Sequence, residues 1–269
     1  MFLIKAIIDF LIVLLLVRLL IRPVEANFNT IYSLIYRISD PILKPAKSIL
    51  RDDTKSVLLS VLCMVLIRGF IYINMSRMTL LAGICGSFLN FFQLLFQFYM
   101  VVWFIAILTG DRTHTPVISI LQRAFLPLSS LSSKLNIPRK SFSFFSFIFL
   151  LFVYSLLSFL LNIIATSQLA SPINFLSSIA EGLILIIALF PGFFSVVIIV
   201  AALLSWVSPD PYNPVVQTIY GISEPLLAPF RKIIPDIGGL DVSPIAALLC
   251  FQIVGGLLKQ IVINLASLI

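Results

Sequence analysis

The sequence predicts an all-α membrane protein, with about six transmembrane helices arranged as three helix–loop–helix repeats and amphipathic interfacial helices in the loops. Composition indicates the membrane: 60% of the 269 residues are hydrophobic and 11% are charged, more apolar surface than a soluble domain of this size can bury. Length indicates the helices, because six apolar runs approach the roughly 17–25 residues that cross about 30 Å of hydrocarbon. These runs are residues 3–21, 57–73, 88–108, 142–165, 184–207 and 245–268.

The first run has an alternative interpretation as a signal peptide. Lys5 precedes the apolar stretch, and Val24-Glu25-Ala26 loosely matches a cleavage site. Arg18, Arg22 and Pro23 follow the run directly, however, and such a basic flank favours a retained membrane anchor.

The distribution of charge predicts the topology. Six spans place the three long loops, residues 22–56, 109–141 and 208–243, on one side of the membrane, and these loops hold most of the cations. The positive-inside tendency then places the loops in the cytoplasm and both termini on the outer side of the membrane. The net charge of +7 indicates anionic membrane lipids as partners, and we expect no nucleic acid.

An internal repeat links the first and last loops. "NTIYSLIYRISDPILKPAKSIL" (29–50) aligns without gaps on "NPVVQTIYGISEPLLAPFRKII" (213–234), with nine of 22 positions identical. The middle loop is a fainter copy if Pro127 is set against Pro45 and Pro229, since Arg123 then replaces the first proline. We therefore predict repeats at 1–75, 76–182 (divergent) and 183–269, the last two beginning in linkers 74–87 and 166–183. Ser171-Pro172 in the second linker predicts a helix start along the outer interface.

The last loop has a specific local pattern. Asn213-Pro214 predicts an N-cap and a first-turn proline, and Ser223-Glu224-Pro225 predicts that the helix restarts. Pro229 predicts a kink, or a helix that begins nearer 226. Gly238-Gly239 permits a sharp turn, and Asp241, Ser243 and Pro244 form a start signal for the last span.

An apolar arc runs along each loop helix. In 226–234 it comprises Leu226, Leu227, Phe230, Ile233 and Ile234, with Arg231 and Lys232 outside it. The first loop shows the same pattern, with Lys47 outside the arc, whereas serines replace the basic pair in the middle loop. Such an arc is typical of a helix in the lipid headgroup layer, and it also fits packing against neighbouring transmembrane helices.

The string "NP" followed by "EPLLAPFRKIIPDIGGLDVSP" resembles the YggT family, called YlmG in Gram-positive bacteria. The resemblance covers about 190–265 and, less closely, 5–73, and the middle repeat departs from the two-repeat pattern common in the family. It marks as motif residues Asn213, Pro214, Pro225, Pro229, Arg231, Lys232, Pro235, Gly238, Gly239, Asp241, Ser243 and Pro244, with Asn29, Pro41, Pro45 and Lys47 as their first-repeat counterparts. It implies an integral membrane protein associated with osmotic or envelope stress and, in plastid relatives, with the assembly of membrane complexes.

No catalytic or metal-binding pattern stands out. His114 is the only histidine, Asp236 and Asp241 fit helix capping, and Cys63, Cys85 and Cys250 show no CxxC spacing. We therefore expect no enzyme activity, no cofactor and no metal, and a protein that organises or assists other membrane proteins through its basic loops.

A small-solute or ion transporter is the alternative. A polar cluster of Lys5, Asp9, Arg68 and Lys259, together with a fifth span interrupted at Pro191-Gly192, is its sequence basis. The simpler interpretation is a Lys5–Asp9 pair one helical turn apart and two snorkelling side chains.

Overall fold

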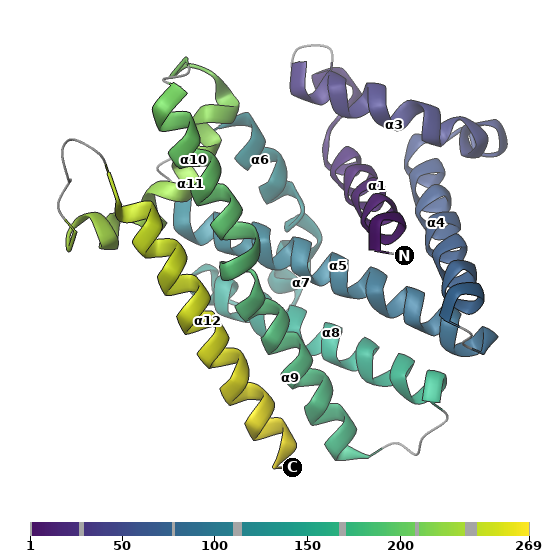
Figure 1. The fold of residues 1–269 in the computed structure, drawn as a ribbon. Coiled ribbons are helices and arrows are strands. Elements are labelled where there is room, and N and C mark those ends of the chain that lie inside the picture. Colours follow the sequence, from purple (N-terminus) through teal and green to yellow (C-terminus); the bar gives the residue numbers. More distant parts are fainter. Residues whose placement is uncertain are drawn as a thin grey trace. The chain divides into compact units, whose positions relative to one another are not determined.

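The computed structural model describes residues 2–26, 30–76, 79–109, 115–166, 171–207, 210–234 and 241–268, and every regular element within them is a helix (Figure 1). The prediction of an all-α protein is confirmed. The elements are α1 (Phe2–Leu20), α2 (Pro23–Ala26), α3 (Thr30–Ile49), α4 (Asp53–Ser76), α5 (Leu80–Thr109), α6 (Pro116–Arg123), α7 (Leu126–Lys134), η1 (Arg139–Ser141), α8 (Phe142–Thr166), α9 (Pro172–Ala188), η2 (Phe190–Phe194), α10 (Ser195–Val207), α11 (Pro214–Arg231) and α12 (Ser243–Ser267).

Five helical stretches of the described chain are long and apolar enough to cross a membrane. They are Asp53–Asn74, Leu80–Thr109, Arg139–Thr166, Pro172–Val207 and Ser243–Ser267, and they contain five of the six predicted runs. The sixth run coincides with α1, whose 19 residues include Lys5, Asp9 and Arg18. These three charges are spread along the whole of α1, whereas two of the three charges in Asp53–Asn74 lie within its first three residues. A sixth span therefore stays a prediction.

The chain forms two compact units. The first comprises Met1–Phe98 with Leu156–Ser171, and the second comprises Tyr99–Ser155 with Pro172–Ile269. Helices α5 and α8 contribute to both units. This division groups the chain by contacts, so the three repeat boundaries stay a prediction from the sequence.

In the first unit, α3 lies across the ends of α1 and α4 (Figure 1). Leu43 of α3 is fully buried in a core with residues of the other two helices: Ile12, Leu15, Val57, Val61 and Val65. The sequence left open whether the apolar arc of this loop meets lipid or protein. Its central residues, Leu43 and Ala46, are buried against protein.

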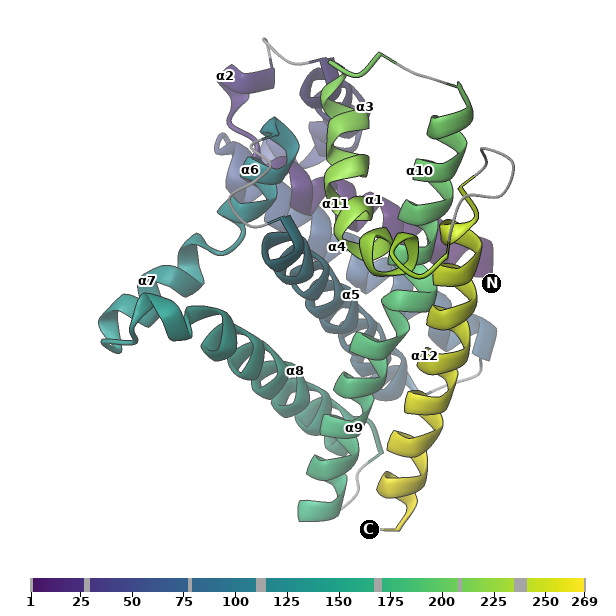
Figure 2. The same ribbon diagram turned by 90° about the vertical axis from the view of Figure 1, so that its left-hand side faces the viewer.

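In the second unit, α9 and α10 form one continuous helical stretch through the π-helical turn η2 (Figure 2). The predicted start at Pro172 is correct, but this helix leads into the fifth span and replaces the predicted linker 166–183. The predicted interruption at Pro191-Gly192 is the π-turn itself. Two side chains donate to its carbonyl groups: Ser195 Oγ to Phe190 at 2.9 Å and Gln252 Nε2 to Pro191 at 3.3 Å.

Helix α11 is continuous, so the predicted restart at 223–225 and the alternative start near 226 are both wrong. Pro225 and Pro229 lie inside the helix, as Pro41 and Pro45 lie inside α3. Each interior proline costs about 3 kcal/mol in an isolated helix. Burial of Leu226 and Leu227 at 7% and 2% exposure favours the unbroken helix against that cost.

We predict that Gly69→Val lowers the melting temperature of the detergent-purified protein. A Cβ at Gly69 would lie 3.3 Å from the backbone Cα of Ile84 on α5, so α4 and α5 must separate, at about 1–3 kcal/mol. Gly86→Val is the matched control, because nothing lies within 4 Å of the Cβ position there and the helix-propensity cost is the same. Equal melting temperatures for the two variants would contradict this close approach.

Candidate functional site

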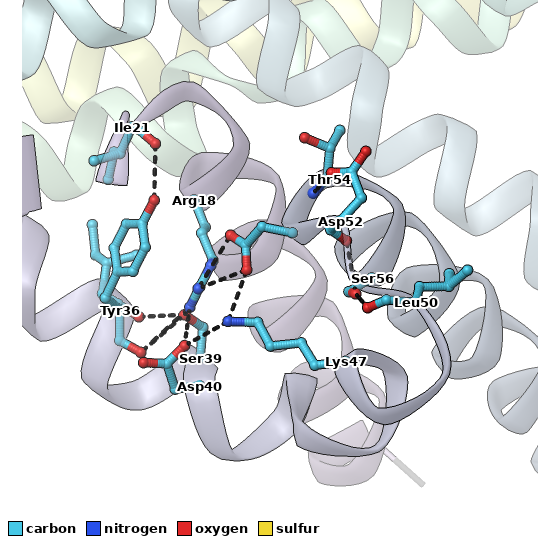
Figure 3. Close-up of polar contacts among 12 residues, drawn as sticks. Arg18, Ile21, Tyr36, Ser39, Asp40, Lys47, Leu50, Asp52, Thr54 and Ser56 are labelled. Atoms are coloured by element: carbon cyan, nitrogen blue, oxygen red, sulfur yellow. Dashed lines mark hydrogen bonds and ion pairs between the residues drawn. The ribbon is translucent and has the colours of Figure 1, made fainter. Parts of the chain in front are cut away.

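A buried cation joins α1, α3 and α4. Arg18, at the end of α1, is 2% exposed and forms ion pairs with Asp40 of α3 at 2.9 Å and with Asp53 of α4 at 3.3 Å (Figure 3). Its guanidinium also donates to Ser39 Oγ at 2.6 Å and lies 4.0 Å from the ring centroid of Tyr36. The planar fork of arginine can serve these partners together, which the single ammonium of lysine cannot.

Lys47 completes this cluster. Its Nζ lies 2.7 Å from a carboxylate oxygen of Asp53 and 3.4 Å from one of Asp40 (Figure 3). The hydrogen bond to the Asp53 carboxylate raises the pKa of Lys47, so the ammonium stays charged throughout the physiological range. Two cations and two anions therefore balance where α3 meets the start of α4.

Helix α11 has a corresponding ion bridge. Arg231 pairs with Glu224 of the same helix at 2.5 Å and with Asp241, just before α12, at 2.8 Å. Glu224 and Arg231 align with Asp40 and Lys47 of α3. In both the first and the last loop, a basic side chain seven residues after an acid thus links the loop helix to the start of the next helix, α4 or α12.

The acid before α12 is held by several donors. The backbone N–H and hydroxyl group of Ser243 donate to Asp241 Oδ1 at 2.9 and 2.5 Å. Burial alone would raise the pKa of Asp241, but the hydrogen bonds from Ser243 and from the Arg231 guanidinium outweigh it and lower this pKa below its ordinary value. The carboxylate therefore stays ionised at neutral pH.

The middle loop differs from the other two. At the aligned positions it has Gln122 and Ser129 in place of the acid and the base, and residues 115–141 contain no acid. Its helix also breaks at Ala124–Phe125, between α6 and α7, where α3 and α11 are continuous. No ion bridge of this kind can form there.

Most predicted motif residues lie on α11 and at the start of α12. Asn213 caps α11, accepting from the Val215 N–H at 2.9 Å, and Pro214 is its first residue, as predicted. Lys232 is exposed and forms no ion pair with the described residues. Pro225 and Pro229 lie inside α11, and Ser243 and Pro244 begin α12. Asn29, His114, Pro235, Asp236, Gly238 and Gly239 lie outside the described residues.

The cations of the first loop fall into two groups. Lys47, expected to face lipid, is instead paired with Asp40 and Asp53, as Arg231 is with its own acids. A second group on and just after α3 is exposed and forms no ion pair with the described residues: Arg37, Lys44, Arg51 and Lys55. Arg37 and Lys44 are seven residues apart and lie on one side of α3, and Arg51 follows the end of the helix.

A second buried ion pair joins α4 to α1. Arg68 is 1% exposed and pairs with Asp9, while its Nη2 donates to the Ser87 carbonyl at 2.6 Å. Lys5 donates to Asn90 at 2.9 Å, so the predicted Lys5–Asp9 pair is wrong, as is a snorkelling Arg68. Lys259 is exposed on α12 in the second unit.

No metal cluster accompanies these pairs in the described parts of the chain, where no three His, Cys, Asp or Glu side chains gather. The three cysteines are free thiols: Cys63 is exposed, Cys250 is half-buried and Cys85 is buried.

Comparison with known families identifies the last part of the chain. Residues 180–262 match the family described as CCB3/YggT. This segment of the chain is therefore similar to the YggT family. The YggT segment contains η2, α10 and α11, with parts of α9 and α12, and hence the Glu224–Arg231–Asp241 bridge. The Arg18 cluster lies outside the matched residues.

Relatives of the YggT segment are bacterial. An uncharacterized protein of Pseudomonas aeruginosa is 43% identical over 86 residues, which are 32% of this chain and 42% of the relative. The uncharacterized protein YggT of Escherichia coli is 29% identical over 100 residues, which are 37% of this chain and 53% of the relative. The chain thus spans about half the length of these curated relatives. No solved structure matches it.

Sequence reasoning missed Arg18 and Asp53 as organising residues. The signal for both was a charged residue close to the boundary of an apolar run. The alternative polar cluster did group Asp9 with Arg68, and these two residues do pair, since charges are stable in a membrane protein when they pair.

We predict that Arg18→Met releases α3. The carboxylates of Asp40 and Asp53 would lose their buried partner, at about 3 kcal/mol, the lower end for a broken buried pair because both acids are partly exposed. Trypsin should then cleave faster after Arg37 in the detergent-purified protein. Arg51→Met, at an exposed and unpaired site, serves as the control, and unchanged cleavage in Arg18→Met would contradict the role of this cluster.

We also predict a pH-dependent contribution from Asp241. Because its folded pKa is lowered, its stabilisation is present above the unfolded pKa of about 3.9 and is lost as pH falls through the folded value. The melting temperatures of wild-type protein and Asp241→Asn should differ at pH 6 and converge below about pH 4. A difference that stays constant over this range would show that the carboxylate charge is not responsible.

Proposed function

We propose that this chain is a non-enzymatic membrane protein that supports the organisation or assembly of other membrane components. It acts at the cytoplasmic leaflet of the bacterial inner membrane and contributes to tolerance of osmotic or envelope stress. Similarity to the YggT family and five helices suited to membrane spans support the setting. Anionic lipids and membrane proteins are its proposed partners.

The basic side of α3 is the observation on which the proposal rests. The opposite side of α3 is fixed by Arg18 and by the buried Leu43, so the exposed cations point away from α1 and α4. Each cation near an anionic leaflet contributes about 1 kcal/mol. Arg37 and Lys44 act from one side of α3, and Arg51 acts from the segment just after it. Helix α11 has no counterpart of this basic side, so α3 is the lipid-contacting element.

The arrangement as three repeats with six spans belongs to the same proposal. The two ion bridges, Asp40–Lys47–Asp53 and Glu224–Arg231–Asp241, support treating 1–75 and 183–269 as copies. Ile49 and Ile233 occupy aligned positions and are 74% and 79% exposed. We assign these two side chains to contact with the membrane or with partner proteins beside it.

We predict that neutralising the basic side of α3 removes local enrichment of anionic lipid. A cysteine-free chain with Ser48→Cys, an exposed position on α3, is labelled with a donor dye and reconstituted with acceptor-labelled phosphatidylglycerol. Energy transfer should exceed that to labelled phosphatidylcholine, fall with added salt, and fall in the triple variant Arg37→Gln, Lys44→Gln, Arg51→Gln.

The matched control is the triple variant Lys134→Gln, Arg139→Gln, Lys140→Gln, which removes the same charge from exposed positions of the middle loop. It should leave the energy transfer unchanged. Equal transfer to both lipids, or no response to salt, would refute lipid anchoring through α3. In cells lacking the chain, the control triple variant should restore survival after an osmotic upshift, as the wild-type protein does, whereas the α3 triple variant should not.

A further inference from the structure

The middle loop encloses a hollow within the second unit. Its volume is about 570 Å³, within the range of small-molecule sites. Residues of α5, of α6 with α7, and of α8 line it, among them Trp103, Ile107, Gln122, Phe125, Ser129 and Phe142. The hollow is therefore built where two membrane-type helices, α5 and α8, are joined by the divergent loop.

The residues of the middle loop that line the hollow include the two positions that form an ion bridge in the other two loops. Gln122 and Ser129 align with Glu224 and Arg231, which are 2.5 Å apart in α11, and both line the hollow. Phe125 aligns with the buried Leu43 and Leu227 and is itself 9% exposed. The loop thus keeps its buried apolar anchor and replaces the charged pair with two neutral polar side chains at the rim of a hollow.

The lining defines the chemistry of an occupant. Trp103 and Phe142 with Ile107 and Leu126 supply apolar surface, and no lining residue is charged. The Trp103 ring is held in place, since its Nε1 donates to the Ser143 carbonyl at 2.9 Å. The Gln122 amide is exposed and has no hydrogen-bond partner among the described residues, so it is available to a ligand.

We propose that this hollow binds a lipid with an uncharged head, of the diacylglycerol kind. A neutral lining would leave an ionised phosphate unpaired, which disfavours anionic phospholipids. The ester oxygens of a glycerol head can accept from the Gln122 amide. The glycerol hydroxyl can donate to Ser129 Oγ, whose own hydrogen is donated to the Leu126 carbonyl at 2.9 Å. The acyl carbons nearest the glycerol would pack against Trp103 and Ile107. These two residues lie toward the end of α5, a helix suited to span the membrane.

Trp103 provides the test. The chain has two tryptophans, so Trp206→Phe leaves Trp103 as the only one in the full-length protein. The probe is diacylglycerol brominated on its acyl chains, titrated into phosphatidylcholine vesicles that contain this protein. Quenching of Trp103 should saturate at a low mole fraction, and brominated phosphatidylglycerol should quench only in proportion to its concentration.

Two substitutions restore the charges found in the other loops. Ser129→Arg and Gln122→Glu each should weaken diacylglycerol binding about tenfold or more, because a charged side chain at the rim keeps its water and replaces a neutral hydrogen-bonding partner. Ser119→Arg is the control, since this exposed serine of α6 lines neither this hollow nor the adjoining one. Circular dichroism and melting curves confirm folding of each variant. Non-saturating quenching, equal quenching by both lipids, or equal effects of Arg at 129 and 119 would each overturn the proposal.

Discussion

The charge of Arg18 is the constraint on which the first unit depends. Removing a guanidinium from water costs several kcal/mol, and nearby carboxylates must offset that cost. Asp40 reaches Arg18 from α3 and Asp53 reaches it from α4, so neither helix can shift without leaving a buried charge unpaired. The ion pairs of Arg18 and the burial of Leu43 therefore set the position of α3. They also set the direction in which its exposed basic side chains point.

Each of the three loops holds its helix, or pair of helices, against neighbouring helices, and the interactions that do so differ among the loops. In α3 and α11 the solution is ionic: a basic side chain bridges an acid on its own helix and another at the start of the next. In the middle loop Gln122 and Ser129 remove this bridge, the helix divides after Arg123, and a hollow lies beside the break. The loss of one interaction is thus accompanied by space for a ligand.

The sequence predicted what depends on local pattern. Apolar runs gave five of the long helices, and Asn213-Pro214 gave the start of α11, because span length and capping are local properties. The prediction of a break before Pro225 failed because packing of Leu226 and Leu227 outweighs the local cost of proline. The predicted Lys5–Asp9 pair is wrong because Asp9 pairs with Arg68, 59 positions away, a residue that the alternative polar cluster had grouped with it. The predicted lipid contact of Lys47 is also wrong, because its ammonium pairs with the carboxylate of Asp53 at the start of α4.

The π-helical turn within the candidate span Pro172–Val207 changes how the rest of that stretch must be understood. A π-turn accommodates one extra residue, which rotates everything after it by about 100° about the helix axis. Side chains in Pro172–Ala188 and Ser195–Val207 therefore belong to two different angular registers. A lipid-facing and a protein-facing side can be defined within each half, but a single helical wheel drawn over all 36 residues would assign one half to the wrong environment.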